Sequence, residues 1–191
     1  MHEPKPMRVP TFFLSDLHLG TRGCQAEKLL DSLRDREPDL VYLVGDIVDG
    51  WQLKSGWYRP QSHNDVVQKL LRKARRGARM IYAPGNHDEF MWDFDGAHFG
   101  GIAVVEKTIH EAAGGRRYLI IHGDPFDVLI RHAVIRRFDG LLYVNCGDWV
   151  ESCTAIVETY AGEFQLIRWA DEVNARRVVQ VKTPVELEAA A

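Results

Sequence analysis

Four short polar clusters hold the side chains of this sequence that are best suited to chemistry. They combine carboxylate, imidazole and amide groups, and they are Asp16-Leu17-His18, Gly45-Asp46-Ile47-Val48-Asp49, Gly85-Asn86-His87-Asp88 and His122-Gly123-Asp124. These groups form a ligand set that suits manganese, iron or zinc better than a thiolate-loving metal. In two clusters a glycine directly precedes the polar residue, as expected where backbone must approach an ion or phosphate closely. The clusters predict a site for divalent metal ions.

The spacing of the clusters places them at the ends of neighbouring strands. The first three follow apolar runs that predict buried strands over Val9–Leu14, Leu40–Val44 and Met80–Ala83. Helical periodicity lies between these runs, over Ala26–Arg36 and again in a second segment containing Val66, Val67, Leu70, Leu71 and Ala74. Because the carboxyl ends of parallel strands meet at one edge of a sheet, we expect the polar clusters to be neighbours.

Each cluster taken alone has a simpler explanation. An aspartate at a strand end is commonly a helix N-cap or part of an Asx turn, and a lone histidine is often structural. That explanation fits any one cluster as well as a metal site does. Four clusters in this order, each after an apolar strand, favour the metal site.

The second half of the chain changes to the period of β-structure. Short strands are expected at Ile102–Val105, Thr108–Glu111 and Tyr118–His122, followed by hairpins pairing Val134–Arg137 with Leu141–Asn145 and Thr154–Glu158 with Phe164–Trp169. The predicted fold class is α/β (α+β), a two-sheet mixed β-sandwich flanked by helices. We expect a single domain over residues 1–170 and a polar, poorly ordered tail over 171–191.

Composition narrows the class of protein. The 191 residues are 46% hydrophobic and 27% charged, as in one soluble globular domain. A net charge of -3 gives no overall case for nucleic-acid binding, and three scattered cysteines indicate neither a disulfide framework nor a zinc knuckle. The sequence has no long apolar run and no signal-peptide pattern near its start, so a cytoplasmic location is expected.

One basic run has two interpretations. Arg72-Lys73-Ala74-Arg75-Arg76 could contact anionic phospholipid at the inner face of a membrane. Alternatively, it is the solvated, positively charged last turn of a helix.

The four clusters, read as Asp-x-His, Gly-Asp-x-x-Asp, Gly-Asn-His-Asp and His-Gly-Asp, resemble the motifs of the calcineurin-like metallophosphoesterases. Within that family, four stretches are similar to the UDP-2,3-diacylglucosamine pyrophosphohydrolase (diphosphatase) group of lipid A biosynthesis: Ser15–Gly20, Leu43–Trp51, Pro84–Phe90 and Asn145–Cys153. The likeness extends from about Val9 to about Trp169. It implies hydrolysis of the pyrophosphate bond of that nucleotide lipid by a metal-bound hydroxide.

The resemblance also implies roles for particular residues. Asp16 and His18 would bind a first metal, Asp46 would bridge both metals, and Asn86 and His122 would bind the second. Manganese is the first expectation for the two divalent ions, with iron, zinc or magnesium as alternatives. Two such ions can activate a water and clamp phosphate oxygens for in-line attack.

His87 and Asp49 are the expected catalytic pair. The family likeness makes His87 the residue that contacts phosphate and helps the leaving oxygen, and it makes Asp49 the carboxylate that orients this imidazole. An imidazole tuned near neutrality and held by a carboxylate suits that task.

The sequence departs from the family pattern after the His-Gly-Asp cluster. The family's Gly-His-x-His motif is absent, and so is the helical cap insert of the pyrophosphohydrolases. The simplest account is an internal deletion near His132–Ala133, which would remove the cap, a core strand and two imidazole ligands and leave an exposed sheet edge. His132 would then be either a replacement ligand or a structural histidine.

Three functions follow from these observations. The first is a pyrophosphohydrolase that takes the nucleotide lipid as its partner, with peripheral membrane contact and no nucleic acid. The second is a degenerate, non-catalytic member of the family that keeps weak metal or nucleotide binding. The third is a generic phosphodiesterase that acts on soluble nucleotides in a cleft left open by the missing cap.

Overall fold

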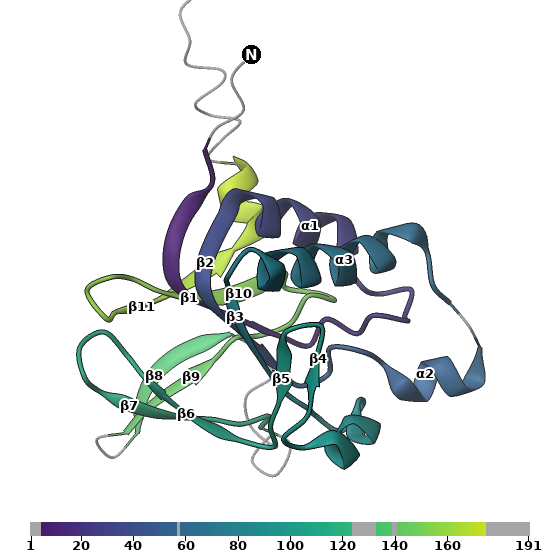
Figure 1. Ribbon diagram of the computed structural model, residues 1–191. Helices are drawn as coiled ribbons and strands as arrows, with labels where there is room; N and C mark the ends of the chain where they lie inside the picture. Colours follow the sequence, from purple (N-terminus) through teal and green to yellow (C-terminus); the bar gives the residue numbers. More distant parts are fainter. Residues whose placement is uncertain (1–4, 57, 124–132, 139–140, 175–191) are drawn as a thin grey trace, which may run out of the picture.

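A seven-stranded mixed sheet forms the centre of the molecule in the computed structural model, which describes residues 5–56, 58–123, 133–138 and 141–174 (Figure 1). Its strand order is β11-β10-β1-β2-β3-β5-β4. The parallel centre consists of β1 (Met7–Ser15), β2 (Arg36–Val44), β3 (Arg79–Ala83) and β5 (Ile102–Val104). Antiparallel pairing then adds β10 (Thr154–Glu158) to β1, β11 (Phe164–Arg168) to β10 and β4 (His98–Phe99) to β5.

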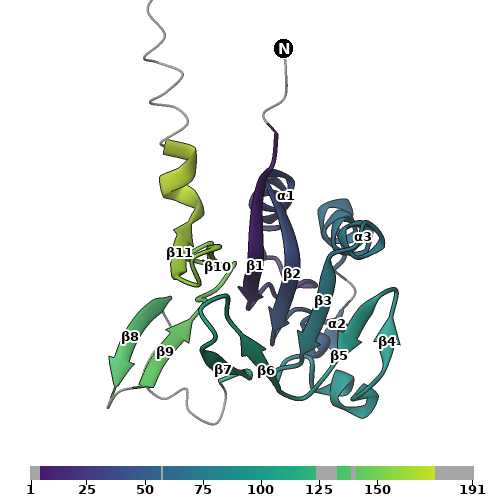
Figure 2. The ribbon, with the colours of Figure 1, turned by 60° about the vertical axis from the view of Figure 1, so that its left-hand side comes forward.

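Two helices cover one face of this sheet. Helices α1 (Ala26–Asp35) and α3 (Gln61–Arg75) lie side by side in both ribbon views (Figures 1 and 2). Alternate residues of β1, such as Phe12 and Leu14, point to this face and join Leu29 of α1 and Val66 of α3 in one apolar core. The predicted strand–helix–strand units are confirmed.

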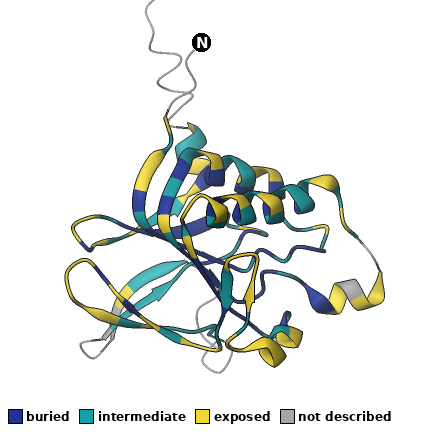
Figure 3. Ribbon diagram, in the orientation of Figure 1, coloured by how far each residue is buried: buried dark blue, intermediate teal, exposed yellow. Residues whose placement is uncertain are grey.

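Two hairpins form the layer on the other face. They pair β6 (Thr108–Glu111) with β7 (Arg117–Ile120) and β8 (Val134–Phe138) with β9 (Leu141–Asn145). Their apolar side chains, including Ile120, Ile135 and Val144, pack on a second core built from Phe13, Tyr42, Ile81 and Ile156 of the large sheet. In Figure 3 the buried residues are concentrated in the central strands, between the two outer layers.

The α/β class is confirmed, with one difference in its second layer. Among the described residues, the two hairpins are separate two-stranded sheets and do not form one continuous sheet. The segment between the hairpins, residues 124–132, lies outside the described residues and includes His132 and Asp124, so the expected loss of a core strand near His132–Ala133 stays a prediction.

Several short elements went unpredicted because they are too short to show periodicity. They are α2 (Gly50–Ser55), the 3-10 helix η1 (Glu89–Phe94) and β4. Strand β2 also begins at Arg36, before the predicted Leu40, because residues 36–38 pair with Met7–Val9 of β1. Pairing with a neighbouring strand thus lengthens an element beyond its apolar run.

The start of the expected tail is helical. Residues 169–174 form a helical turn in which Glu172 pairs with the buried Arg36. Residues 175–191 lie outside the described residues. Across the described ranges, no helix is long and apolar enough to cross a membrane.

Candidate active site

Backbone hydrogen bonds join the loops that follow β1, β2 and β3. The N–H of Asp16 donates to the carbonyl of Gly45 at 3.1 Å, and the N–H of His18 donates to the carbonyl of Asp46 at 2.8 Å. The N–H of Gly45 in turn donates to the carbonyl of Ala83, at the end of β3, at 2.7 Å. The clusters therefore meet at the carboxyl edge of the sheet, as their spacing predicts.

Three polar residues of these loops have left-handed backbone conformations. The φ angles are +52° at Asp16, +49° at His18 and +52° at Asp46. Residues other than glycine rarely adopt this region, and such outliers gather at functional sites, where the surrounding structure holds them. These angles turn the three side chains toward one another at the end of the sheet.

Asp49 holds both histidines of the site. Its Oδ2 atom lies 3.2 Å from Nδ1 of His18 and 3.0 Å from Nδ1 of His87, and its Oδ1 accepts the backbone N–H of Gln52 at 2.8 Å. Burial acts to raise the pKa of Asp49, but these hydrogen bonds lower it below its ordinary value. A carboxylate on Nδ1 leaves Nε2 of each imidazole free to face a ligand.

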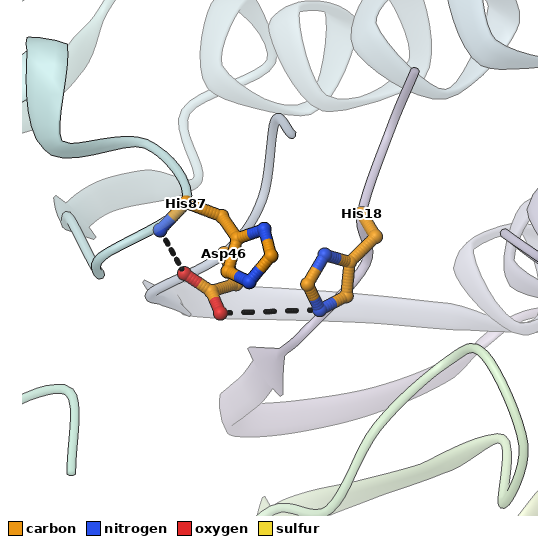
Figure 4. A group of neighbouring side chains, drawn as sticks. All are labelled: His18, Asp46 and His87. Carbon is orange, nitrogen blue, oxygen red and sulfur yellow. Dashed lines mark hydrogen bonds and ion pairs between the residues drawn. The ribbon is translucent and has the colours of Figure 1, made fainter. Parts of the chain in front are cut away.

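Asp46 lies between the imidazoles and is 4% exposed. Its Oδ1 accepts the backbone N–H of His87 at 2.9 Å, and its Oδ2 lies 3.9 Å from Nε2 of His18 (Figure 4). The same Oδ2 lies 3.7 Å from Nε2 of His122. The two longer separations exceed a hydrogen bond. They leave the carboxylate oxygen and the two ring nitrogens facing a common space.

Two glycines make room for this arrangement. A Cβ atom on Gly45, where φ is +67°, would lie 1.9 Å from Nδ1 of His122. A Cβ atom on Gly85 would lie 2.5 Å from Oδ1 of Asp46 and 2.7 Å from the His122 ring. The glycines of the second and third clusters therefore allow the close approach of site side chains.

The site carries an excess of negative charge. Burial raises the pKa of Asp16 to about 6, and the nearby Asp46 carboxylate also acts to raise it. Ionising a second carboxylate here is unfavourable without a cation. The residues present therefore fit a divalent cation, and ligand atoms of His18, Asp46 and His87 lie within 4.8 Å of one another.

The sequence of this chain matches the model of a known protein family. The sequence model described as calcineurin-like phosphoesterase matches residues 9–183. The chain belongs to the calcineurin-like phosphoesterase family. Metallophosphoesterases of this family generally bind divalent metals, in agreement with the donor set around Asp46.

Curated relatives of this phosphoesterase carry one name. The chain is 32% identical over 119 residues to the UDP-2,3-diacylglucosamine hydrolase of Chromohalobacter salexigens, and the match covers 61% of this chain and 47% of the relative. The enzyme of the same name from Ralstonia nicotianae is 29% identical over 138 residues, which cover 70% of this chain and 50% of that enzyme. That from Porphyromonas gingivalis is 26% identical over 125 residues, covering 62% and 47%. The chain spans about half the length of these relatives.

The phosphoesterase fold places the seven predicted site residues at one edge. Asn86 is half-buried in the loop after β3, and His122 follows β7, so His122 reaches the site from the hairpin layer. The family likeness gives His87 the role of a phosphate contact. Its imidazole lies in the same group of potential donors as His18 and Asp46, and its role as a phosphate contact stays a prediction.

Sequence reasoning assigned no role to Asp88, although the residue ends the Gly-Asn-His-Asp cluster. It is fully buried and accepts hydrogen bonds from the backbone N–H of Ile47 at 2.8 Å, from the N–H of Gly85 and from the hydroxyl of Tyr82. Burial raises its pKa. Asp88 thus ties the loop after β2 to the loop after β3 beneath the site.

Two tryptophans also border the site. The exposed ring of Trp51, on α2, lies 4.2 Å from the ring of His87 between centroids. The backbone N–H of Trp149 donates to the carbonyl of Asp16 at 3.0 Å, which links the stretch Asn145–Cys153 to the first cluster. These contacts bring parts of the stretches Leu43–Trp51 and Asn145–Cys153 next to the site.

Proposed function

We propose that this phosphoesterase hydrolyses the pyrophosphate bond of UDP-2,3-diacylglucosamine, a reaction of lipid A biosynthesis. Water would add across the bond to give UMP and the lipid monophosphate. The observation that carries the proposal is the pair of imidazoles, His18 and His87, held by Asp49 beside the Asp46 carboxylate. The name of the curated relatives, UDP-2,3-diacylglucosamine hydrolase, supports the choice of substrate.

The proposed metal ligands are Asp16, His18, Asp46, Asn86 and His122, with manganese as the first choice of metal. Bound divalent ions would lower the pKa of a water and neutralise charge on the phosphate oxygens. Because the substrate is a lipid, the proposal includes contact of the chain with a membrane surface.

The residues of the chain then have separate tasks. Asp49 keeps a proton on Nδ1 of His87 and so fixes the direction of its Nε2. In the proposal, Nε2 of His87 donates a proton to the phosphate oxygen that leaves as the phosphorus–oxygen bond breaks. The ring of Trp51 packs on His87 and limits its rotation.

The test is hydrolysis of UDP-2,3-diacylglucosamine by the purified chain with and without manganese. Asp46→Ala serves as the control for contaminating activity, since this carboxylate is central to the donor set. Turnover that needs manganese and disappears in Asp46→Ala supports the proposal. Equal turnover by the chain and the variant would overturn it.

A second candidate is a degenerate member of the family that binds metal or nucleotide without turnover. It is favoured by the absence of the Gly-His-x-His motif from this sequence. A generic phosphodiesterase acting on soluble nucleotides is a third. Assays with UDP-2,3-diacylglucosamine and with bis(p-nitrophenyl) phosphate, together with calorimetric metal titration, separate the three functions. Turnover of the lipid supports the pyrophosphohydrolase, and turnover of the soluble diester alone supports the generic phosphodiesterase. Metal binding without turnover supports the degenerate member of the family.

A further inference from the structure

A groove lies between α1 and α3, on the helical face of the sheet. Its cavity volume is about 520 Å³, and its polar lining consists of Arg34, Asp65, Lys69, Arg72, Lys73 and Arg76. The last turns of the two helices lead into the first residues of β2 and β3. The groove therefore extends toward the amino ends of the strands, whereas the candidate active site is at their carboxyl ends.

The groove is strongly basic. Five of the lining side chains are cationic, and Asp65 is the single carboxylate among the lining residues of the described structure. Asp65 already accepts a hydrogen bond from Nε2 of Gln61 at 2.8 Å. The chain as a whole has a net charge of -3, so this local concentration of positive charge does not reflect its composition.

Two of the cations are already paired. Nη1 of Arg34 lies 2.6 Å from Oδ1 of Asp31, and Nζ of the buried Lys73 donates to the carbonyl of Arg36 and lies 3.7 Å from Oε2 of Glu37. Within the described ranges, the side chains of Lys69, Arg72 and Arg76 make no hydrogen bond or ion pair. Three donors are therefore available to a ligand in the groove.

The positive charges repel one another. Burial lowers the pKa of Lys69, and the positive charges of Arg34, Arg72 and Arg76 lower it further, against the opposing effect of the Glu37 carboxylate. The helix dipole favours cations only in the last turn, which accounts for Arg72 and Arg76 but not for Lys69. An anion in the groove would reverse the repulsion.

We propose that this groove binds a phosphate-bearing anion of the phosphomonoester class. The exposed Arg72 and Arg76 supply guanidinium groups that match phosphate oxygens bidentately, and the half-buried Lys69 supplies a point charge. The volume accommodates a phosphate together with part of the molecule that carries it. The site is separate from the proposed hydrolytic centre and does not depend on the proposed function.

Two probes share this chemistry and distinguish its source. Glycerol 3-phosphate is a free phosphomonoester, and phosphatidic acid presents the same group on a membrane. Binding of the magnesium-loaded full chain would be measured by calorimetry for the first probe. For the second, it would be measured by sedimentation with phosphatidylcholine vesicles that contain or lack phosphatidic acid.

The groove variants are Lys69→Gln and Arg72→Gln, and the matched control is Arg75→Gln. Arg75 is exposed on the same helix and does not line the groove, so it tests the loss of one charge alone. We expect each groove variant to weaken binding of at least one probe by roughly tenfold, as for the loss of one charge-assisted hydrogen bond. Any probe that binds at the hydrolytic centre should bind there equally in all variants, so it does not affect the comparison between them.

Loss of vesicle binding alone would identify a lipid headgroup, and loss of glycerol 3-phosphate binding alone would identify a free phosphomonoester. The proposal is overturned if Arg75→Gln weakens binding as much as the groove variants do, or if the unmodified chain binds neither probe. Melting curves of Lys69→Gln, Arg72→Gln and Arg75→Gln confirm that each variant is folded.

Discussion

At the scale of single residues, Asp49 organises the candidate active site. One of its carboxylate oxygens holds the Nδ1 atoms of both His18 and His87, and the other caps the start of α2 through Gln52. A group that orients two functional imidazoles at once affects chemistry more than stability, because both rings depend on it for their direction.

We expect Asp49→Asn to lower kcat/KM for a phosphodiester by about 10–100-fold, the usual cost of losing a carboxylate behind a functional histidine. The amide keeps the shape and one acceptor, but its N–H2 group must face either the two imidazoles or the backbone N–H of Gln52, all of which contact carboxylate oxygens of Asp49. Steady-state assays with manganese would measure the change. Asp39→Asn is the control, because Asp39 is exposed in a surface ion pair with Arg8. Unchanged kcat/KM in Asp49→Asn would contradict the assigned role.

The pKa of Asp16 predicts a pH dependence of metal binding. With this pKa at about 6, the carboxyl is protonated below pH 6 in the metal-free protein and must lose its proton when an ion binds. Metal affinity should therefore rise with pH up to about 6, with release of up to one proton from Asp16 near pH 5 and almost none near pH 8.

Calorimetry in two buffers with different ionisation enthalpies measures this proton release. Asp16→Asn is the comparison, since it retains the histidines and removes only this carboxyl. If the chain and Asp16→Asn release the same number of protons near pH 5, the raised pKa is not coupled to metal binding.

At the scale of elements, the loops after β1, β2 and β3 carry the chemistry, and the strands set only their positions. Hydrogen bonds among these loops and the buried Asp88 beneath them hold the polar side chains together. The loops can approach one another this closely because Gly45 and Gly85 have no side chains.

We expect Gly85→Ala to displace Asp46 or His122, since its Cβ would lie 2.5 Å and 2.7 Å from these side chains. Overpacking of this kind typically costs about 1–3 kcal/mol of stability. The displaced ligands should also reduce metal affinity. Melting curves and metal titration measure the two effects. Gly114→Ala is the matched control, because a Cβ atom on Gly114 would meet no other atom within 4 Å. Equal behaviour of the two variants would exclude the close-packing argument.

At the scale of the whole molecule, the candidate active site brings together residues of the large sheet and a histidine of the hairpin layer. His122 follows strand β7 of the hairpin layer, and its Nε2 lies 3.7 Å from Oδ2 of Asp46. Buried Glu158 of β10 joins the layers: it accepts hydrogen bonds from Thr11 at 2.7 Å, from Nε2 of His110 at 2.8 Å and from the N–H of Ala113 at 2.7 Å.

We expect Glu158→Gln to destabilise the fold by about 1–3 kcal/mol. The glutamine amide would point an N–H group at a hydrogen-bond donor that now donates to a carboxylate oxygen of Glu158. For a chain of this length the melting temperature should fall by roughly 3–10 °C. Thermal unfolding measures the change, with the exposed Glu163→Gln as the control. An equal melting temperature in both variants would show that the network does not join the layers.

Much of the fold could be predicted because its signals are local. The apolar run Val9–Leu14 and the helical spacing of Leu29 and Leu33 each predict an element that the structure contains. Short elements such as α2 and β4 have no periodicity to detect. The early start of β2 could not be predicted, because it depends on pairing with β1.

Residue types and their spacing along the chain are enough to predict the kinds of donor at the site, the strand ends that carry them and the family motifs. The packed fold alone shows that Asp49 holds two histidines, that His87 joins the donors around Asp46 and that Lys69 and Arg34 line the same groove. These contacts join residues far apart in the chain. Their geometry follows from how the strands, loops and helices pack, which no local pattern specifies.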